Sequence, residues 1–330
     1  MSDTSSAGDA VTQLFLMDPI ETVLVDKDST FALMLESQRR GHTVLYALVT
    51  DLYLRSGEVR VVARTAKVKP VQGQHAELGP ALDLSLDGID VVWMRKDPPF
   101  DMGYIFNTYL LGLAESRGTL VLNKPEGLRS MNEKAWAMRF AELVPTSVIT
   151  QDIKRIRAFA EELGAIVVKP LDGNGGEGVF IVKSNDPNIG VILEASTQHG
   201  RRKVLAQRYL PEAKAGDKRI ILVEGEPVGA ILRVPQGVDH RGNIHVGAKV
   251  ESSNLTEREQ LICKTIGPFL REFGQVFVGI DVIGDQLTEV NVTSPTGIHE
   301  IRAFDGTDVA ALVVDAAMAR LARQAHAALP

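Results

Sequence analysis

The chain has 330 residues, 45% of them hydrophobic, and a formal net charge of -6 at pH 7. That length and apolar content allow a large core divided over two or three lobes. The acidic balance, without a basic run, argues against a nucleic-acid partner. Cys263 is the only cysteine, so an intramolecular disulfide is excluded and a structural zinc cluster is not expected.

Residues 1–11 are polar and acidic, which predicts a disordered tail. They lack the positively charged start and apolar core of a signal peptide. No apolar run is long enough to cross a bilayer, since Asp315, Arg320 and Arg323 interrupt even the final Ala-rich segment. We therefore expect a cytoplasmic protein without a membrane partner.

Residues 12–128 predict an N-terminal α/β domain with a Rossmann-like parallel sheet. Two apolar runs, 14–17 and 43–49, flank a helix that Ser29 can cap and Gly41 can end. A strand, helix, strand unit of this kind implies parallel strands. The remaining predicted elements of this domain are a strand at 90–94, a helix at about 104–116 and a strand at 119–122.

The tripeptide Arg95-Lys96-Asp97 follows the predicted strand at 90–94 and precedes two prolines. Open α/β sheets place their ligands beyond the carboxyl ends of the strands. The tripeptide is therefore a candidate for holding an anionic or zwitterionic substrate. A solvated turn explains the same residues equally well.

Residues 129–205 predict a central domain. Asn132 can cap a helix that ends at Pro145, and Lys134 lies in its first turn, where a cation opposes the helix dipole and calls for a compensating anion. A second helix is predicted at 152–163.

A hairpin is predicted at 165–182, with a glycine-rich connection that follows Lys169. Its glycines are Gly173, Gly175, Gly176 and Gly178. Glycine lets the backbone approach a ligand and direct N–H groups at it, which suits a phosphate chain. A loose hairpin turn is the alternative. A lysine that leaves an apolar strand favours the phosphate interpretation.

Residues 206–330 predict a C-terminal domain. A glycine-rich polar segment at 235–250 is expected to be a mobile loop that orders over a ligand and carries Arg241 and Lys249 inward. Thr256 and Glu259 form a capping box for the next helix. The other predicted elements are strands at 203–210, 217–223 and 228–234, a turn at 225–227, and a final helix at about 307–328.

The stretch 277–296 contains two β-branched runs around Gly284-Asp285 and predicts a hairpin. If Ile283 pairs with Leu287, then Asp281 faces Glu289, and Asn291 follows on the same side of the strand. Two carboxylates and an amide oxygen are hard ligands that suit Mg²⁺, with Mn²⁺ as a substitute, and Mg²⁺ usually completes its shell with substrate phosphates. An exposed polar face is the alternative.

Taken together, these motifs resemble the ATP-grasp ligases and, more narrowly, the bacterial glutathione synthetases. The likeness extends from Leu14 to Ala319. The strings that carry it are Met17-Asp18-Pro19-Ile20, Lys27-Asp28-Ser29, Met94-Arg95-Lys96-Asp97-Pro98-Pro99-Phe100-Asp101, Asn132-Glu133-Lys134, Lys169-Pro170-Leu171-Asp172-Gly173 and Thr288-Glu289-Val290-Asn291-Val292-Thr293-Ser294-Pro295-Thr296.

The resemblance implies an N-terminal substrate lobe followed by a two-lobed ATP-grasp fold, with ATP held between the central and C-terminal lobes. It implies that γ-glutamylcysteine and glycine are joined to glutathione through an acyl phosphate, giving ADP and phosphate. No enzymic nucleophile is required, and the sequence contains no Gly-x-Ser-x-Gly motif. The family further suggests a homo-oligomer, either a tetramer or a dimer.

The resemblance also implies residue roles. Those for ATP are Lys134, Lys169, Gly173, Gly175, Gly176, Gln207, Tyr209, Leu210, Asp217 and Arg219. Those for catalysis are Arg219, Arg233 and Arg241. Those for the metal are Asp281, Glu289 and Asn291. Those for the peptide substrate are Asp28, Arg95, Ser294, Pro295 and Thr296. The chain departs from the family pattern where Lys249 and His299 stand for arginines and Ala248 for a glycine.

Two other functions stay open on sequence alone. A different ATP-grasp ligase, for instance one that joins D-alanines or extends a protein terminus, would share the nucleotide half but lack the Arg95-Lys96-Asp97 lobe. A nucleotide-binding regulatory protein should have lost part of the set Asp281, Glu289, Asn291, Lys134 and Arg219, all of which are present.

Overall fold

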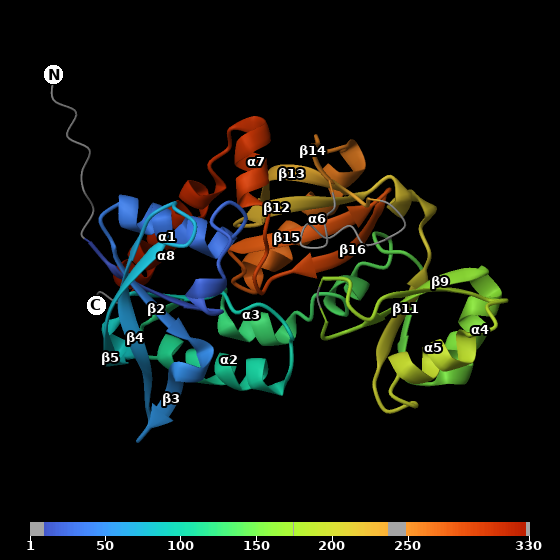
Figure 1. The fold of residues 1–330 in the computed structure, drawn as a ribbon, viewed down its shortest axis with the longest axis horizontal. Coiled ribbons are helices and arrows are strands. Elements are labelled where there is room, and N and C mark those ends of the chain that lie inside the picture. Colours follow the sequence, from blue (N-terminus) through green and yellow to red (C-terminus); the bar gives the residue numbers. More distant parts are fainter. Residues whose placement is uncertain (1–9, 174, 237–248, 328–330) are drawn as a thin grey trace.

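The structure is a computed structural model that describes residues 10–173, 175–236 and 249–327. Figure 1 shows three sheets that follow one another along the chain. Most of the predicted tail, most of the predicted mobile loop, Arg241 and Ala248 lie outside the described residues. Within the described ranges, no helix is long and apolar enough to cross a membrane.

The first sheet has the strand order β3-β4-β2-β1-β6-β7, and β5 pairs with β4. Its parallel part is the predicted one, in which β1 lies between β2 and β6 and β7 follows β6. The bounds of these elements are β1 Thr12–Met17, α1 Ser29–Arg39, β2 Thr43–Leu48, β6 Val91–Met94, α2 Met102–Glu115 and β7 Leu120–Leu122. The N-terminal lobe is therefore Rossmann-like, as predicted.

Two details of this lobe differ from the prediction. Asp28, not Ser29, caps α1, because its carboxylate accepts a hydrogen bond from the backbone N–H of Phe31 at 2.8 Å. Residues 51–89, for which no element was predicted, form an antiparallel extension of the sheet. Its strands are β3 Leu52–Arg55, β4 Glu58–Val68 and β5 Ala76–Ser85. Alternating burial of Val59, Val61 and Ala63 is the period-two signal that marks β4.

The central sheet has the order β10-β9-β11-β8. Its elements are β8 Ser147–Thr150, α4 Ile153–Leu163, β9 Ala165–Pro170, β10 Phe180–Lys183, α5 Ile189–Ser196 and β11 Val204–Arg208. The two helices pack on this sheet and close an apolar core of their own, around Ile156, Val168 and Leu193. The predicted helix at 152–163 and hairpin at 165–182 are confirmed.

The predicted helix from Asn132 to Pro145 is wrong. After α3 (Pro125–Ser130), this segment contains only a short 3-10 turn at Trp136–Arg139. The reason is that its backbone bonds elsewhere: the carbonyl of Glu133 accepts from Val290 N–H at 2.8 Å, and that of Leu143 accepts from Leu287 N–H at 2.7 Å. A segment that lies along a neighbouring strand in this way cannot complete a helical ladder.

The third sheet is antiparallel, in the order β14-β13-β12-β15-β16. Its strands are β12 Asp217–Val223, β13 Glu226–Val234, β14 Lys249–Ser252, β15 Phe277–Ile283 and β16 Gln286–Asn291, and the helices are α6 Glu257–Glu272, α7 Ile298–Asp305 and α8 Val309–Ala327. The capping box of α6 is confirmed. The predicted turn at 225–227 lies earlier, at Glu224-Gly225, since β13 already begins at Glu226.

The first and third sheets are joined by buried contacts. Helices α7 and α8 pack against α1, and Arg40 of α1 bonds both Asp315 and the carbonyl of Ala311. Asn123, just after β7, donates to the carbonyls of Phe277 and Val292 at 2.8 and 2.7 Å. Its side-chain oxygen accepts from the N–H groups of Val276 and Phe277. The central sheet, by contrast, stands apart at the right of Figure 1.

Candidate active site

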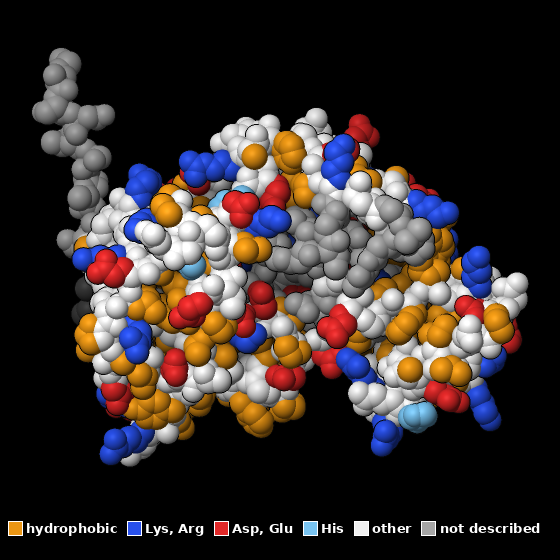
Figure 2. Space-filling model, in the orientation of Figure 1, with side chains coloured by type: hydrophobic (Ala, Val, Ile, Leu, Met, Phe, Trp, Pro, Cys, Tyr) orange, Lys and Arg blue, Asp and Glu red, His pale blue; other side chains and the backbone are white. Residues whose placement is uncertain are grey.

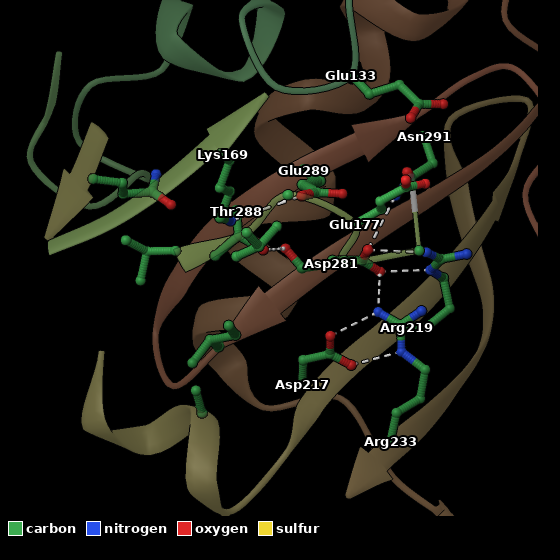
Figure 3. A pocket seen from close by; sticks show the side chains of 18 of the residues that line it. Glu133, Lys169, Glu177, Asp217, Arg219, Arg233, Asp281, Thr288, Glu289 and Asn291 are labelled. Atoms are coloured by element: carbon green, nitrogen blue, oxygen red, sulfur yellow. Dashed lines mark hydrogen bonds and ion pairs between the residues drawn. The ribbon is translucent and has the colours of Figure 1, made fainter. Parts of the chain in front are cut away.

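A cavity of about 1290 Å³ lies between the central sheet and the third sheet. The predicted residues that line it are Lys169, Gly175, Gly176, Gln207, Tyr209, Leu210, Asp217, Arg219, Arg233, Asp281, Glu289, Asn291, Ser294, Pro295 and Thr296. This volume exceeds the roughly 300–1000 Å³ of an ordinary small-molecule pocket, so it has room for more than one substrate. Figure 3 shows the side chains of Arg219 and Arg233 directed toward Asp281, with Asp217 beside them.

The β15–β16 hairpin brings Asp281 opposite Glu289, as predicted. The predicted pairing of Ile283 with Leu287 is wrong, because Ile283 pairs with Gln286 across a two-residue turn, the length that hairpins favour. A bulge between Asp281 and Val282 restores the register. The Thr288 hydroxyl donates to the carbonyl of Asp281 at 3.0 Å within this bulge.

Asp281 is 5% exposed and sits among cations. Arg219, directly across the ladder on β12, donates to both of its carboxylate oxygens at 2.5 and 2.9 Å, and Arg233 lies 3.0 Å from one of them. Burial alone would raise the pKa of Asp281, but the two guanidinium groups hold it well below its usual range. Asp281 therefore stays ionised at neutral pH.

Asp217 and Arg233 form a second bidentate pair, with distances of 2.6 and 2.9 Å. The two residues face each other on β12 and β13. Burial raises the pKa of Asp217, an effect that Arg233 opposes and the charge of Asp281 reinforces. The floor of the cavity thus holds two carboxylates and two guanidinium groups in one network.

Lys134 and Lys169 enter the cavity region from the connecting segment and from β9. Lys134 is 3% exposed, donates to the carbonyl of Gly173 at 2.7 Å and lies 3.9 Å from Glu289. Lys169 lies 3.7 Å from the same Glu289 oxygen. A compensating anion was expected for Lys134, and Glu289 supplies one from within the protein. The reason for that expectation was the dipole of a predicted helix, which is absent.

The glycine loop and the strand β11 line the cavity on the side of the central sheet. Gly175 and Gly176 have φ angles of 63° and 78°, which other residues rarely adopt. Gln207 is buried and donates to the Ser147 hydroxyl at 3.1 Å, and Tyr209 and Leu210 continue the lining. These predicted nucleotide residues thus share one cavity, whereas Lys134 and Gly173, which were also predicted, do not line it.

A second cavity of about 180 Å³ adjoins the first one. Both are lined by Asp97, Ser294 and Thr296, and the smaller one also contains Asp28 and Arg95. The predicted peptide-binding residues are therefore brought together, except Pro295, which lines the larger cavity alone.

Arg95 is a buried cation between the N-terminal and C-terminal lobes. It donates to the Thr30 hydroxyl and to the carbonyl of Pro295, both at 3.0 Å, and its guanidinium lies 5.0 Å from the centre of the Phe277 ring. Burial lowers its pKa to about 10, although Asp97 and Asp28 act in the opposite direction. Even at that value Arg95 remains charged at neutral pH.

The departures from the family pattern have distinct positions. The imidazole of His299, in the first turn of α7, bonds the carbonyl of Asp28 at 3.1 Å, so it connects the C-terminal lobe to the start of α1. Lys249 is exposed at the start of β14 and pairs with Glu251 at 2.9 Å.

Two further residues line the large cavity: Asp97, which was expected to hold substrate only as part of the tripeptide Arg95-Lys96-Asp97, and Glu133, for which no role was predicted. Glu133 is buried and accepts a hydrogen bond from the Thr293 hydroxyl at 2.6 Å, and burial raises its pKa. Both residues lie inside sequence strings on which the family resemblance rests. Their position in those motifs was the signal that could have identified them as site residues.

The predicted metal ligands were tested against the donor chemistry of the cavity. No group of three or more His, Cys, Asp or Glu side chains is placed to hold a metal within the described ranges. The predicted set combines two carboxylates with an amide, and Asn291 donates to Asp281 at 3.1 Å, so these two lie together. The carboxylate and amide oxygens of this set are ligands of the kind that Mg²⁺ accepts, whereas in this structure the groups that bond Asp281 are the N–H donors of Arg219, Arg233 and Asn291.

Comparisons with known proteins agree with this geometry. The chain matches the N-terminal domain model of prokaryotic glutathione synthetase over residues 11–129 and its ATP-grasp domain model over residues 133–306. It is 47% identical to glutathione synthetase of Escherichia coli K12 over 310 residues, covering 94% of this chain and 98% of the relative. It is 46% identical to that of Salmonella typhi over 309 residues, 93% and 98% of the two chains.

Solved structures resemble the fold at low identity. The D-cycloserine synthetase DcsG superposes with a TM-score of 0.66 at 15% identity, over 94% of this chain and 99% of that one. The ATP-grasp ligase PsnB, in complex with a minimal precursor, superposes with a TM-score of 0.60 at 17% identity, over 94% and 98%. These likenesses concern the fold alone.

Proposed function

Because the chain belongs to the prokaryotic glutathione synthetase family and is an ATP-dependent ligase that makes glutathione, we propose how its two cavities divide the reaction. The observation that supports the proposal is that Asp97, Ser294 and Thr296 line both cavities. The larger cavity takes ATP and the smaller one the peptide substrate, so the reacting groups meet where the cavities join.

ATP lies between the central and C-terminal sheets in this proposal. Lys134, Lys169 and the glycine loop at 173–176 face its phosphates, because cations and backbone N–H groups stabilise a phosphate chain. Gln207, Tyr209 and Leu210 hold the adenine end. The support is that these nucleotide residues either line the cavity or, like Lys134 and Gly173, bond to one another beside it.

γ-Glutamylcysteine places its γ-glutamyl end in the smaller cavity. That end carries an ammonium and a carboxylate, and the cavity offers groups of both signs, including Asp28 and Arg95. Ser294, Pro295 and Thr296 follow the strand that carries Glu289 and lead into the larger cavity. The cysteinyl carboxylate then reaches the γ-phosphoryl group of ATP.

The chemistry needs positioning and neutralisation of charge. The cysteinyl carboxylate attacks the γ-phosphorus, which gives an acyl phosphate and ADP, and the amine of glycine then displaces phosphate. Arg219 and Arg233 lie beside the site of transfer, and we assign the same role to Arg241, which is outside the described residues. A lost contact of this kind costs about 3 kcal/mol, or about a hundredfold in rate, by analogy with an oxyanion-hole donor.

Asp281, Glu289 and Asn291 would hold Mg²⁺, or Mn²⁺ in its place. When bound, the metal neutralises charge on the phosphates. The residues themselves keep their donor groups oriented: Asp281 is fixed by Arg219 and Asn291, and Glu289 lies near both lysines. We also propose the domains 12–128, 129–205 and 206–330, with β11 crossing the second boundary to complete the central sheet.

We propose in addition that the chain forms a homo-oligomer, a dimer or a tetramer. Helix α2 exposes an apolar stripe of Met102, Phe106, Tyr109 and Leu113, spaced four, three and four residues apart and each between 44% and 59% exposed. Figure 2 shows hydrophobic side chains gathered over the underside of the N-terminal lobe, where α2 lies. Such spacing suits a helix pairing with a copy of itself. Phe106→Glu should reduce the mass measured by light scattering.

The test of the proposed function is phosphate release with Mg²⁺-ATP, γ-glutamylcysteine and glycine, with each component omitted in turn and glycine replaced by D-alanine. Glutathione identified by mass, with release that needs both substrates, supports the proposal. Asp281→Asn and Glu289→Gln should abolish metal-dependent turnover and leave the folded state intact by circular dichroism. Unchanged turnover in both variants would contradict the metal assignment.

A further inference from the structure

Asp97 occupies the junction of the two cavities, and it is the carboxylate that lines both of them. Its backbone N–H donates to Asp18 at 3.0 Å, and two prolines follow it. The side chain is accessible from the cavities. Held in place by its backbone and reachable from both cavities, it is positioned to meet a reacting group.

The second half of the reaction contains a proton transfer that the cations of the site cannot perform. The amine of glycine arrives as an ammonium ion at neutral pH, and it must lose a proton before its nitrogen lone pair can attack a carbonyl carbon. The other groups shared by the two cavities, Ser294 and Thr296, are hydroxyls and weak bases. A carboxylate at the junction is the suitable acceptor.

Four of the other five carboxylates that line the large cavity are engaged. Asp281 and Asp217 are held by Arg219 and Arg233. Glu133 is buried and bonded to Thr293. Glu289 lies near two lysines, and we have assigned it to the metal. Glu177 sits on the glycine loop, on the nucleotide side of the cavity.

The charges around Asp97 favour proton uptake. Lys96 pairs with Asp18 at 2.7 Å and donates to the backbone carbonyl of Asp97, so its ammonium is already engaged. The surrounding protein raises the pKa of Asp97 through loss of solvation, and Asp18 and Asp28 add to the shift, whereas Ser294 and Arg95 oppose it. A carboxylate with a raised pKa is a stronger base than an ordinary one.

We propose that Asp97 is the general base that deprotonates the acceptor ammonium. One carboxylate oxygen takes a proton from the ammonium, and the freed lone pair forms the C–N bond at the acyl carbon. The C–O bond to the phosphoryl group breaks and phosphate leaves with that electron pair. The new C–N nitrogen loses its second proton to the departing phosphate, and Asp97 returns the first proton to water. This step rests on the proposed placement of the substrates.

Asp97→Asn separates the two half-reactions, because it keeps the shape of the side chain and removes the base. Glutathione formation should fall by about a hundredfold or more. Hydroxylamine is largely unprotonated at neutral pH and intercepts an acyl phosphate without a base. Hydroxamate formation from ATP, γ-glutamylcysteine and hydroxylamine should therefore continue at nearly the unsubstituted rate.

Several outcomes decide the assignment. Equal loss of both products, with a raised KM for the dipeptide, would show that Asp97 binds substrate and would overturn the proposal. Unchanged glutathione formation would overturn it too. Asp97→Glu, which keeps a carboxylate, should recover part of the rate, and Asp83→Asn, a surface carboxylate on β5, is the matched control. Absence of hydroxamate with the unsubstituted protein would instead refute the proposed function.

Discussion

The two interfaces of this molecule are built differently. We call the interface between the N-terminal and C-terminal lobes the fixed seam, and the interface between the central sheet and the third sheet the polar seam. Between the N-terminal and C-terminal lobes, buried neutral hydrogen bonds of Asn123 and an apolar core shared by α1 and α8 make one body. Between the central sheet and the third sheet, the charged contacts include two long ion pairs, in which Lys134 and Lys169 lie 3.9 and 3.7 Å from Glu289. The central lobe keeps an apolar core of its own.

The difference teaches where each substrate can enter. The smaller cavity lies in the fixed seam, so the peptide meets a preformed surface. The larger cavity lies in the polar seam, between the third sheet and a central sheet whose apolar core is separate from the cores of the other sheets. Regions that open are drawn from the less stable parts of a structure. We therefore expect the polar seam, where the nucleotide binds, to open while the fixed seam, where the peptide binds, stays closed.

Asn123→Ala should have the largest effect, because it breaks the fixed seam. Its removal leaves the buried N–H groups of Val276 and Phe277 and the carbonyls of Phe277 and Val292 without their partner. We expect the free energy of unfolding to fall by about 4 kcal/mol, measured by urea denaturation.

The control for this variant is Asn188→Ala. Asn188 precedes α5 in the central lobe and makes no side-chain capping bond, so its loss should change the free energy of unfolding by less than about 0.5 kcal/mol. Equal effects of the two variants would mean that the seam around Asn123 has no special role.

Leu193→Ala should lower the free energy of unfolding of the central lobe by about 3 kcal/mol and leave the other two lobes unaffected. Leu193 is fully buried in the core of the central lobe, whereas Leu33 of α1 is fully buried in the core that the other two lobes share. Hydrogen exchange should quicken within the central lobe alone in Leu193→Ala, and in both other lobes in Leu33→Ala. Faster exchange throughout the chain in both variants would contradict independent bodies.

Lys134→Met weakens the polar seam and removes a cation from the phosphate site. Turnover should fall by about a hundredfold, or about 3 kcal/mol in activation free energy, while the free energy of unfolding changes little. Steady-state kinetics and urea denaturation measure the two quantities. Lys183→Met, on the exposed side of β10, is the control and should leave turnover unchanged.

The smallest effect concerns Cys263, which lies in the core shared by the N-terminal and C-terminal lobes. Burial raises its pKa to about 12, whereas an unfolded thiol titrates near about 8.5. Its contribution to stability is therefore complete below the unfolded value and declines as pH rises, by about 1 kcal/mol at pH 9. Denaturation of the unsubstituted protein and Cys263→Ala at pH 7 and pH 9 measures the difference.

The sequence predicted the parallel sheet, the glycine hairpin and the Asp281–Glu289 pair because each depends on local pattern. It did not reveal β3 to β5. The alternation in β4 is a strand signal that was left unused, and no side chain of β5 is buried, so that strand lacks such a pattern. The predicted helix after Asn132 failed because its backbone pairs with β16, a contact more than a hundred residues away.

The residues of the candidate site were likewise predictable only in part from the sequence. Lysines and carboxylates inside motifs could be named from sequence, but the Arg219–Asp281 and Arg233–Asp217 pairings depend on how β12 registers against β15 and β13. The position of Asp97 between two cavities depends on contact between the first and third sheets. Arg241 lies outside the described residues, so its role stays a prediction.

The packing of α8 on α1 also bears on how the chain is made. A ribosome releases α1 long before α8, and domains generally fold in the order of their synthesis. Here the apolar face of α1 is covered only after residues 309–327 have been synthesised. The nascent N-terminal lobe therefore remains incomplete until almost the whole chain has been translated.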